Sequence, residues 1–472
     1  MSKQLGRARV HSDIQTVLIV TKARDNRLIK LTRELALYLM LKPRQDQKRG
    51  LVVYVDSQLR YSRRFDAEGI RAQHPDLFIP FPRRQTSSST SVSSSTSGTT
   101  KDDVYGRDDG QLRYWTSSMC SQTPQLFDFV VTLGGDGTVL FTSWLFQRIV
   151  PPVLSFALGS LGFLTNFDFA DYHAVMDSAL DSGIRVNLRM RFTCTVYRAV
   201  SYEEGTRQTF EVLNDLVVDR GPSPYVSLLE LFGDEHHMTT VQADGLTVST
   251  PTGSTAYSLS AGGSLVHPEI PAILITPICP HTLSFRPMLL PDSMELRICV
   301  PYNSRSTAWA SFDGRGRIEL KQGDHIKVTA SKYPFPTVCA DKQSTDWFHS
   351  ISRTLKWNER ERQKSFVVVE EESPVKIKKQ NKQVTASERV NESAEEIEEE
   401  GEVSDEEEDA FDINDSSPDP IHPSSSAHPV SEEENKRLQK PTHTALEDAL
   451  HGVLVSSASK KNRRHKSRSR SL

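Results

Sequence analysis

Apolar residues occur in short continuous runs along the first part of the chain, a pattern typical of strands buried on both faces of a parallel sheet. These runs predict strands over residues 16–22, 50–56, 129–133 and 153–157. Between the first two runs, apolar positions recur every three or four residues and predict an amphipathic helix over 28–41. A strand, a helix and a strand in this order build a parallel sheet by a right-handed crossover. We therefore expect an α/β nucleotide-binding domain over residues 16–169.

From residue 185 the pattern changes to β-rich segments with alternating positions and with turns between them, which is typical of antiparallel strands. It predicts strands over 192–197, 209–213, 239–242, 246–249, 294–300 and 325–329. Helical patterns are few in this part, so we expect a second, mainly antiparallel β domain over 170–366, with a returning segment at its C-terminal end. An active cleft would then lie between the two domains.

Three segments lack a pattern that could form a packed core. Residues 1–15 precede the first strand, 83–109 contain a long Ser/Thr run, and 367–472 change from acidic to Ser/Pro-rich to basic. Ser/Thr runs and blocks of like charge are typical of solvated, disordered chain. We expect a flexible N-terminus, a flexible insert and a disordered tail. For the basic end of the tail, we favour a solvated, disordered segment over a nuclear localisation signal or a nucleic-acid contact.

The composition of the chain argues against several classes of protein. The 472 residues carry a net charge of only −4, so the molecule as a whole is not an electrostatic partner for nucleic acid. The five cysteines stand singly, without the spacing of a zinc site or a disulfide framework, and no dedicated set of metal ligands is evident. Since no apolar run approaches the roughly 18 to 20 residues that span a bilayer, we expect no membrane partner. These features predict a reduced, cytoplasmic protein, with a nuclear fraction if the basic tail acts as an address.

A glycine-rich corner follows the predicted strand 129–133. Gly134, Gly135 and Gly137 permit a tight turn and leave backbone amides unshielded by side chains. Thr138 is expected to cap a helix over 139–147, and a helix N-terminus behind a glycine turn stabilises phosphate oxygens. The corner therefore predicts a nucleotide cradle. It would replace the Gly-x-x-x-x-Gly-Lys-Ser/Thr loop, which does not occur in the chain.

Asp136 is the one acid in this corner, and phosphates would repel it unless it has a task of its own. It could take a proton from a hydroxyl nucleophile, or it could bind a cation shared by the phosphates. Either task points to phosphoryl transfer. An Asp-Gly turn that merely closes a strand–helix corner is the alternative, and the motif alone does not decide between them.

A second segment rich in small polar residues follows the predicted strand 246–249. Thr252, Gly253, Ser254 and Thr255 offer hydroxyl groups and bare backbone, and Tyr257 offers a flat ring with a phenol. Such a run suits close approach by a large polar ligand such as a dinucleotide. A Ser/Thr-rich turn that caps a helix is the alternative interpretation.

Taken in order, these motifs resemble those of ATP-dependent NAD kinases. The resemblance rests on Gly-Gly-Asp-Gly-Thr at 134–138, Asn-Asp at 214–215, Asp-Gly at 244–245, Pro-Thr-Gly-Ser-Thr-Ala-Tyr at 251–257 and Pro-His-Thr-Leu-Ser-Phe-Arg-Pro at 280–287. Residues 310–315 and 346–358 resemble the eukaryotic, fungal-type branch. The resemblance implies the two-domain fold shared by NAD kinases and diacylglycerol kinases.

The resemblance also implies a reaction, in which the γ-phosphoryl group of ATP moves to the 2′-hydroxyl of the adenosine ribose of NAD and gives NADP. It implies Mg²⁺ or a similar divalent cation and a homo-oligomer whose neighbouring subunits complete the NAD site. By carry-over, Asp136 is the proton acceptor, and Gly135 and Gly137 lie against phosphates. The remaining implied dinucleotide residues are Phe163, Asn214, Asp215, Asp244, Gly245, Thr252, Gly253, Ser254, Thr255, Ala256, Tyr257 and Ser260.

One position departs from the family pattern. The family usually has Asn-Glu where this chain has Asn214-Asp215, and Asp keeps the carboxylate but shortens its reach by one methylene. Two other functions stay open from the residues alone. A lipid kinase of the sphingosine or diacylglycerol type shares the glycine corner but is not expected to carry the 251–257 segment. A non-catalytic nucleotide-binding regulator is the other, against which an intact Asp136 argues.

Overall fold

A computed structural model of the chain describes a defined set of residues, and the segments 83–109 and 415–472 lie outside it. The described residues are 9–11, 13–43, 49–80, 110–159, 161–199, 207–282, 284–340, 343–357 and 411–414. Among them, no helix combines the length and the apolar composition that a bilayer crossing requires.

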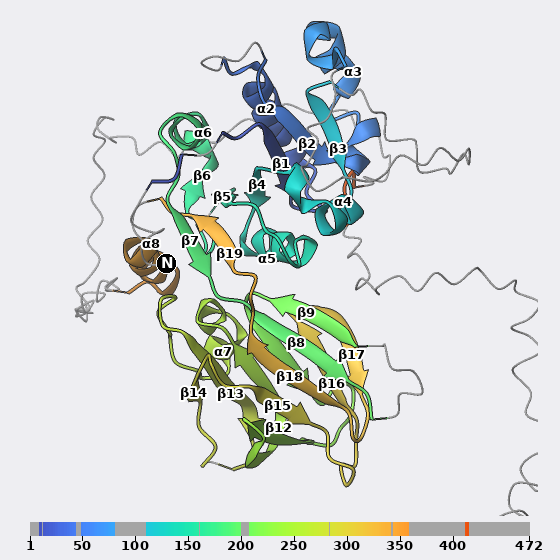
Figure 1. The fold of residues 1–472 in the computed structure, drawn as a ribbon, viewed down its shortest axis with the longest axis vertical. Coiled ribbons are helices and arrows are strands. Elements are labelled where there is room, and N and C mark those ends of the chain that lie inside the picture. The colour runs from blue at the N-terminus through green and yellow to red at the C-terminus, as the bar shows by residue number, and fades with distance from the viewer. Residues whose placement is uncertain are drawn as a thin grey trace, which may run out of the picture. The chain divides into compact units, whose positions relative to one another are not determined.

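The first sheet is built almost entirely from parallel strands (Figure 1). In spatial order its strands are β3 (Leu112–Trp115), β2 (Val52–Asp56), β1 (Thr16–Thr21), β4 (Phe129–Gly134), β5 (Val153–Ala157), β19 (Phe335–Val338) and β7 (Val186–Arg189), with β6 (Phe167–Asp168) paired to β5. Neighbouring strands run parallel except β19 and β7. The predicted parallel α/β domain is confirmed.

Strand β1 shows why the apolar runs are continuous. Val17 and Ile19 point into one core cluster, whereas Leu18 and Val20 point into another on the opposite face. Helix α2 (Arg27–Leu41), the helix expected over 28–41, packs on the first face through residues such as Leu35. Both faces are buried, so every position of the strand has to be apolar or internally hydrogen-bonded.

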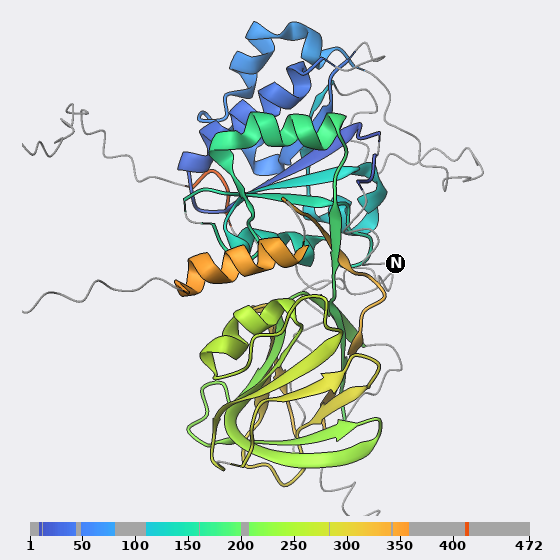
Figure 2. The ribbon, with the colours of Figure 1, turned by 90° about the vertical axis from the view of Figure 1, so that its left-hand side faces the viewer.

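The second sheet is antiparallel throughout its described pairs, and Figure 2 shows that it is curled. Its path runs β17 (Arg315–Leu320), β16 (Ala308–Phe312), β10 (Asp215–Asp219), β12 (His236–Ser249), β11 (Ser227–Gly233), β15 (Leu296–Cys299), β18 (His325–Ala330), β8 (Phe192–Tyr197) and β9 (Gln208–Val212), with β13 (Ala272–Pro280) and β14 (Met288–Pro291) joined through β12. In β8 the residues Phe192, Cys194 and Val196 alternate as buried positions, which confirms the mainly antiparallel β domain.

The first sheet contains strands from both sides of residue 169, where the sequence analysis places the boundary between the two domains. Helix α6 (Tyr172–Asp181) leads into β7, which belongs to the first sheet, and β19 returns to the same sheet from the far end of the chain. The pairing of β7 with β19 joins segments about 150 residues apart, as in the hydrogen bond from Thr337 to the Asn187 carbonyl. Local periodicity carries no information on such a pairing.

The two strands expected over 239–242 and 246–249 are a single strand, β12. The ladder continues through Asp244 and Gly245, because Gly245 pairs with Asp219 on β10. A Cβ at Gly245 would lie 2.8 Å from the Val218 carbonyl oxygen, so the glycine allows close approach of two strands and does not make a turn.

Short helices complete the described part of the fold. They are α3 (Ala67–Gln73), α4 (Ser117–Gln122), α5 (Asp136–Leu145), α7 (Tyr257–Ser260) and α8 (Gln343–Leu355), together with the 3-10 turns η1 (Ser57–Tyr61), η2 (Pro75–Phe78), η4 (Pro124–Leu126), η5 (Phe169–Asp171) and η6 (Thr252–Thr255).

Two segments expected to be flexible contain ordered residues. Near the N-terminus, the backbone of Val10 pairs with that of Ile184, and Ile14 is buried in the core cluster of the first domain. In the acidic tail, Phe411–Asn414 lie against the first domain, and Ile413 is 5% exposed within its core cluster. One apolar side chain among many acids is enough to anchor this short piece, which corrects the expectation of a wholly solvated tail.

Candidate active site

The glycine corner begins the helix earlier than its sequence suggests. Helix α5 starts at Asp136 and not at 139, since Gly135 is the last extended residue before it. Thr138 therefore does not cap the helix; its N–H donates to the Gly135 carbonyl within the first turn. Its side chain lies against Gly134, where φ is +154° and an added Cβ would be 2.3 Å from Thr138 Oγ1. Glycine is thus required at 134 for the close approach of strand and helix.

A cavity of about 610 Å³ opens beside this corner. It is lined by Thr21, Lys22, Ala23, Asp25, Arg27, Leu28, Gly134, Gly135, Gly137, Thr138, Phe141, Leu158 and Arg315. The cavity lies at the carboxyl ends of β1, β4 and β5, where ligands of open α/β sheets bind. Four residues of the predicted cradle line it, although Asp136 does not. Its size suits a nucleotide-sized ligand.

Three cations on this cavity were missed from the sequence. Lys22 directly follows β1, and its Nζ lies 3.2 Å from Asp25 Oδ2. Arg27 begins α2. Arg315 comes from β17 of the second sheet, where its guanidinium lies 4.9 Å from the ring centre of Phe141. Positive side chains beside unshielded amides at a helix N-terminus form a site for several phosphates. Lys22 had a usable signal, since it is the last residue of the predicted strand 16–22.

The Asp136 carboxylate is held by the loop after β5. It accepts hydrogen bonds from the backbone N–H of Phe163 at 2.9 Å, from the N–H of Leu164 at 3.0 Å and from the Thr165 hydroxyl at 3.2 Å. A Cβ at Gly162 would lie 2.3 Å from Asp136 Oδ1, so the loop can close on the carboxylate only with glycine there. The side chain is half-buried, oriented by three donors, and adjacent to the predicted ring-flanking residue Phe163.

The Asn214-Asp215 pair is fixed by an acid that sequence reasoning did not single out. Asp313, in the turn between β16 and β17, accepts from the backbone N–H of Leu213 at 2.8 Å, Asn214 at 2.7 Å and Asp215 at 3.1 Å. The Asn214 Oδ1 atom is buried and has no hydrogen-bond partner in the described part of the protein. Buried polar atoms are rarely left unpaired, so this oxygen is a candidate ligand-binding atom.

Burial sets the protonation of this pair of acids. Desolvation and the nearby Asp313 charge raise the pKa of Asp215 to about 7, against the opposing hydrogen bond from the Tyr257 backbone. Burial also raises the pKa of Asp313 to about 6, although its three backbone hydrogen bonds oppose this shift.

The 251–257 segment packs directly on Asn214. The Thr250 N–H donates to the Asn214 carbonyl at 2.9 Å, and a Cβ at Gly253 would lie only 2.0 Å from that oxygen. Thr252, Gly253 and Ser254 are buried, Thr255 and Ala256 are half-buried, and Tyr257 and Ser260 are exposed. No side chain caps α7. The helix-capping alternative is therefore not what the structure shows.

Buried Arg189 connects the two groups of predicted residues. Its Nη1 donates to Thr252 Oγ1 at 3.3 Å, its Nε donates to Thr337 Oγ1 at 3.1 Å, and the charge of Asp136 acts on it. Asp244 lies elsewhere on β12 and pairs with Arg220 at 3.1 Å. The predicted dinucleotide residues from 214 to 260 do not line the cavity of the glycine corner, so the structure presents two neighbouring groups.

The described residues contain no group of three or more His, Cys, Asp or Glu side chains that could hold a metal ion. Mg²⁺ in phosphoryl-transfer sites is commonly bound through substrate phosphates and one or two carboxylates.

Two family models match the chain. The ATP-NAD kinase N-terminal domain matches residues 17–184, and the ATP-NAD kinase C-terminal domain matches residues 213–340. The second match includes the 251–257 segment, by which we distinguished an NAD kinase from a lipid kinase.

Individual proteins give the same result. The NAD(+) kinase of Saccharomyces cerevisiae (strain ATCC 204508 / S288c) is 43% identical over 431 residues, which are 89% of this chain and 73% of that protein. An ATP-NADH kinase of the same yeast is 51% identical over 267 residues, 54% of each chain. A crystal structure of yeast NADH kinase complexed with NADH is 31% identical, with a TM-score of 0.57 over 75% of this chain and 91% of that chain. The chain therefore belongs to the NAD kinase family.

Proposed function

We propose that this protein transfers the γ-phosphoryl group of ATP to the 2′-hydroxyl of the adenosine ribose of NAD and so makes NADP. In this reaction a bond forms between the ribose oxygen and the γ-phosphorus, and the bond from that phosphorus to the β–γ bridging oxygen breaks. ADP leaves with the bridging oxygen, and the hydroxyl proton passes to a base. The observation that carries the proposal is an oriented carboxylate, Asp136, at the N-terminus of a glycine-led helix beside a cationic cavity.

The cavity suits the triphosphate of ATP. The negative charge of the transferring phosphoryl group would be neutralised from two sides. The unshielded amides of Gly135 and Gly137 would donate hydrogen bonds, and the positive charges would come from Lys22, Arg27 and Arg315. Positioning and charge neutralisation supply most of the rate enhancement in phosphoryl transfer. A divalent cation, held mainly by the phosphates, would supply further neutralisation of charge.

Asp136 is the proposed general base, because a secondary hydroxyl is a poor nucleophile at neutral pH and a positioned base is typically worth about 10² to 10⁴ in rate. The Phe163 and Leu164 amides and the Thr165 hydroxyl fix its orientation. In this proposal the carboxylate has to exchange part of that hydrogen bonding for the ribose hydroxyl when NAD binds.

The dinucleotide is proposed to lie along the second group of residues. The unpartnered Asn214 Oδ1 supports this placement, because it is a buried acceptor that a ligand N–H or O–H could satisfy. The proposed contacts are Phe163, Asn214, Asp215, Asp244, Gly245, Thr252, Gly253, Ser254, Thr255, Ala256, Tyr257 and Ser260. Tyr257 is 44% exposed, which supports a site completed by a neighbouring subunit of a homo-oligomer. A cytoplasmic location is part of the same proposal.

The test is a product assay with the full chain. Purified protein is incubated with ATP, Mg²⁺ and NAD, and NADP is measured with an NADP-specific dehydrogenase. Parallel reactions contain NADH or diacylglycerol as the acceptor. NADP formation that requires ATP supports the proposal, and the ratio of rates with NAD and NADH gives the acceptor preference. Phosphorylated lipid without NADP would contradict it.

A further inference from the structure

We propose that residues Phe411–Asn414 of the acidic tail are a docking motif for the protein's own first domain, and that their docking holds one wall of the nucleotide cavity in place. The motif is the red-orange segment of Figures 1 and 2, and it belongs to the same compact unit as both sheets. We call the residues that receive it, Arg24, Asn26, Gln58, Ser62 and Arg64, the tail-docking surface.

The main chain of the motif is bound at three consecutive residues. The Asp412 N–H donates to Asn26 Oδ1 at 3.2 Å, and the Ile413 carbonyl accepts from the Arg24 N–H at 3.0 Å. The Asn414 N–H donates to Gln58 Oε1 at 2.9 Å, while Gln58 Nε2 approaches the Asn414 carbonyl at 3.4 Å. Bonding along the backbone fixes the register of the segment on the surface.

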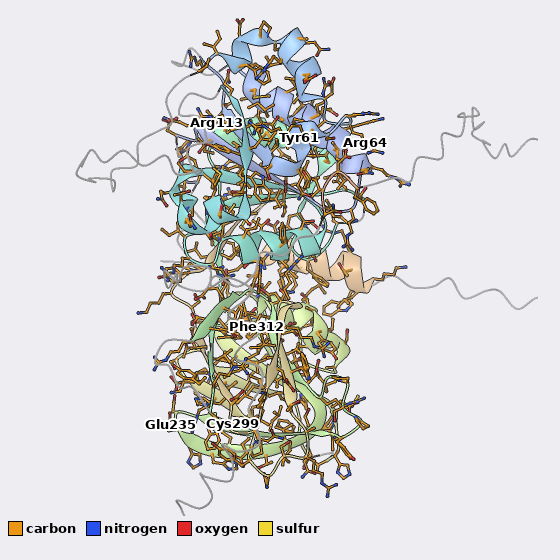
Figure 3. All side chains as sticks on the ribbon, turned by 90° about the vertical axis from the view of Figure 1, so that its right-hand side faces the viewer. Tyr61, Arg64, Arg113, Glu235, Cys299 and Phe312 are labelled. Atoms are coloured by element: carbon orange, nitrogen blue, oxygen red, sulfur yellow. The ribbon has the colours of Figure 1, made fainter. Side chains whose placement is uncertain are left out.

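The side chains add chemical selectivity. The Asp412 carboxylate accepts from the Ser62 hydroxyl at 2.7 Å and from Arg64 at 3.2 Å. Figure 3 labels Arg64 together with Tyr61 on the first domain. Ile413 is 5% exposed and packs in the core of that domain, whereas Phe411 remains 46% exposed. The surface therefore selects an acid followed by a branched apolar residue.

The docking surface is continuous with the cavity wall. Ala23 and Asp25, which flank Arg24, both line the cavity, as do Lys22 and Arg27. Arg24 has a positive φ of 57°, a conformation that costs energy for a residue with a side chain. Its N–H bond to the Ile413 carbonyl stabilises this conformation.

Asn26 provides a second link between the docked tail and the cavity wall. It occupies the N-cap position of α2, where an Asn side chain normally accepts from an amide of the first helical turn. No such bond is present: the N–H groups of Leu28 and Ile29 donate to the backbone carbonyls of Asp25 and Asn26, and the Asn26 side-chain oxygen accepts from the Asp412 amide. When the tail leaves, the Asn26 oxygen and the Arg24 N–H lose these partners. We expect the loop over residues 22–26 to shift in response, so that it has one arrangement with the tail docked and another without it.

Occupancy by the chain's own tail is favoured by the long connection over 358–410, which allows the segment to reach its surface. Reciprocal coupling follows from the shared loop: a ligand that prefers the docked arrangement also strengthens docking. This coupling rests on the proposed binding of ATP in the cavity, whereas the docking itself does not.

Hydrogen–deuterium exchange of the full chain tests the docking. Ile413→Asp introduces a charge at the buried position, and Phe411→Asp introduces the same charge at an exposed position of the same motif. We expect amide exchange over residues 22–28 and 412–414 to become at least about tenfold faster in Ile413→Asp and to stay unchanged in Phe411→Asp. Exchange in β5 and β19 of the first sheet should be unaffected in both, which shows that the first domain of the variants folds. Equal protection of residues 22–28 in the two variants would overturn the proposal.

Two further measurements complete the test. Exchange of the wild-type motif should be independent of protein concentration over a hundredfold range, because a motif supplied by a second copy would lose protection on dilution and refute own-chain docking. Calorimetric binding of ATP, which needs no turnover, should show a shift in affinity of about twofold or more for Ile413→Asp and none for Phe411→Asp. Equal affinities would refute the coupling, and an inactive protein with this shift would count against the proposed reaction alone.

Discussion

The carboxylate of Asp313 accepts a hydrogen bond from the backbone N–H of Asn214 across 2.7 Å. This bond joins the turn after β16 to the start of β10, and the same carboxylate also receives the N–H groups of Leu213 and Asp215. The position of Asn214, whose side-chain oxygen is the unpartnered acceptor among the described residues of the site, therefore depends on one half-buried acid.

Asp313→Asn should destabilise the protein by about 2 to 3 kcal/mol, because an NH₂ group would replace one acceptor and leave a buried N–H unpaired. Asp234→Asn is the matched control: Asp313 and Asp234 both lie in hairpin turns, with φ of 50° and 47°, but Asp234 is exposed. Denaturant unfolding gives both values. A loss of stability at 234 as large as that at 313 would show that the turn conformation, and not the loss of hydrogen bonding to the three backbone donors, is responsible.

Alanine variants of two glycines in the corner should distinguish a role in packing from a role in ligand binding. Gly134→Ala should lower stability by about 1 to 3 kcal/mol, because φ is +154° and the new Cβ would lie 2.3 Å from Thr138 Oγ1. Gly137→Ala meets nothing within 4 Å and lies in the first turn of α5, so its stability should be unchanged or slightly higher.

The same two variants differ in the expected kinetics. The methyl group of Gly137→Ala would project toward the cavity, so the KM for ATP should rise by about tenfold while the unfolding midpoint stays at the wild-type value. Thermal unfolding and initial-rate kinetics measure the two effects. An unchanged KM for ATP in a stable Gly137→Ala protein would remove this glycine from the phosphate site.

Sequence patterns predicted the elements whose signals are local. The parallel strands, helix α2 and the glycine corner can each be predicted from a short stretch of neighbouring residues. The order of the motifs along the chain identified the family. The boundaries at the corner were less accurate: Thr138 resembles a cap, but the extended backbone of Gly135 lets the helix start at Asp136.

The missed residues owe their roles to contacts between distant segments. Arg315 reaches the cavity from β17, Arg189 links β7 with η6, and Asp313 binds the chain near residue 214. A periodicity contains no information on such pairings. Ile413 was missed for a different reason, since a single apolar residue in an acidic run does not change the average composition on which the prediction of disorder depends.

Asp136→Asn should lower kcat by about 10² to 10⁴, because an amide cannot take the proton of the ribose hydroxyl. Binding of NAD, measured by calorimetry, should remain within about threefold of wild type, since the dinucleotide residues are unchanged. Asp168→Asn provides the same substitution at an exposed carboxylate that accepts the Ala170 N–H, and its kcat should stay within about twofold. Wild-type turnover in Asp136→Asn would remove this residue from proton transfer.

The free energy of unfolding of the wild-type protein should depend on pH through Asp215, and this dependence should be absent in Asp215→Asn. Burial and the Asp313 charge raise its pKa to about 7, so the folded protein holds the proton more tightly than the unfolded chain, where an Asp has its ordinary value near 4. The stabilisation from this proton is complete below about pH 4 and is lost as the pH rises through about 7. In Asp215→Asn there is no proton to lose. The free energy of unfolding of wild type, relative to the variant, should therefore fall by roughly 2 to 4 kcal/mol between pH 4 and pH 8. Urea unfolding at several pH values measures this difference, and parallel pH profiles for the two proteins would show that Asp215 is ionised in the folded state as readily as in the unfolded chain.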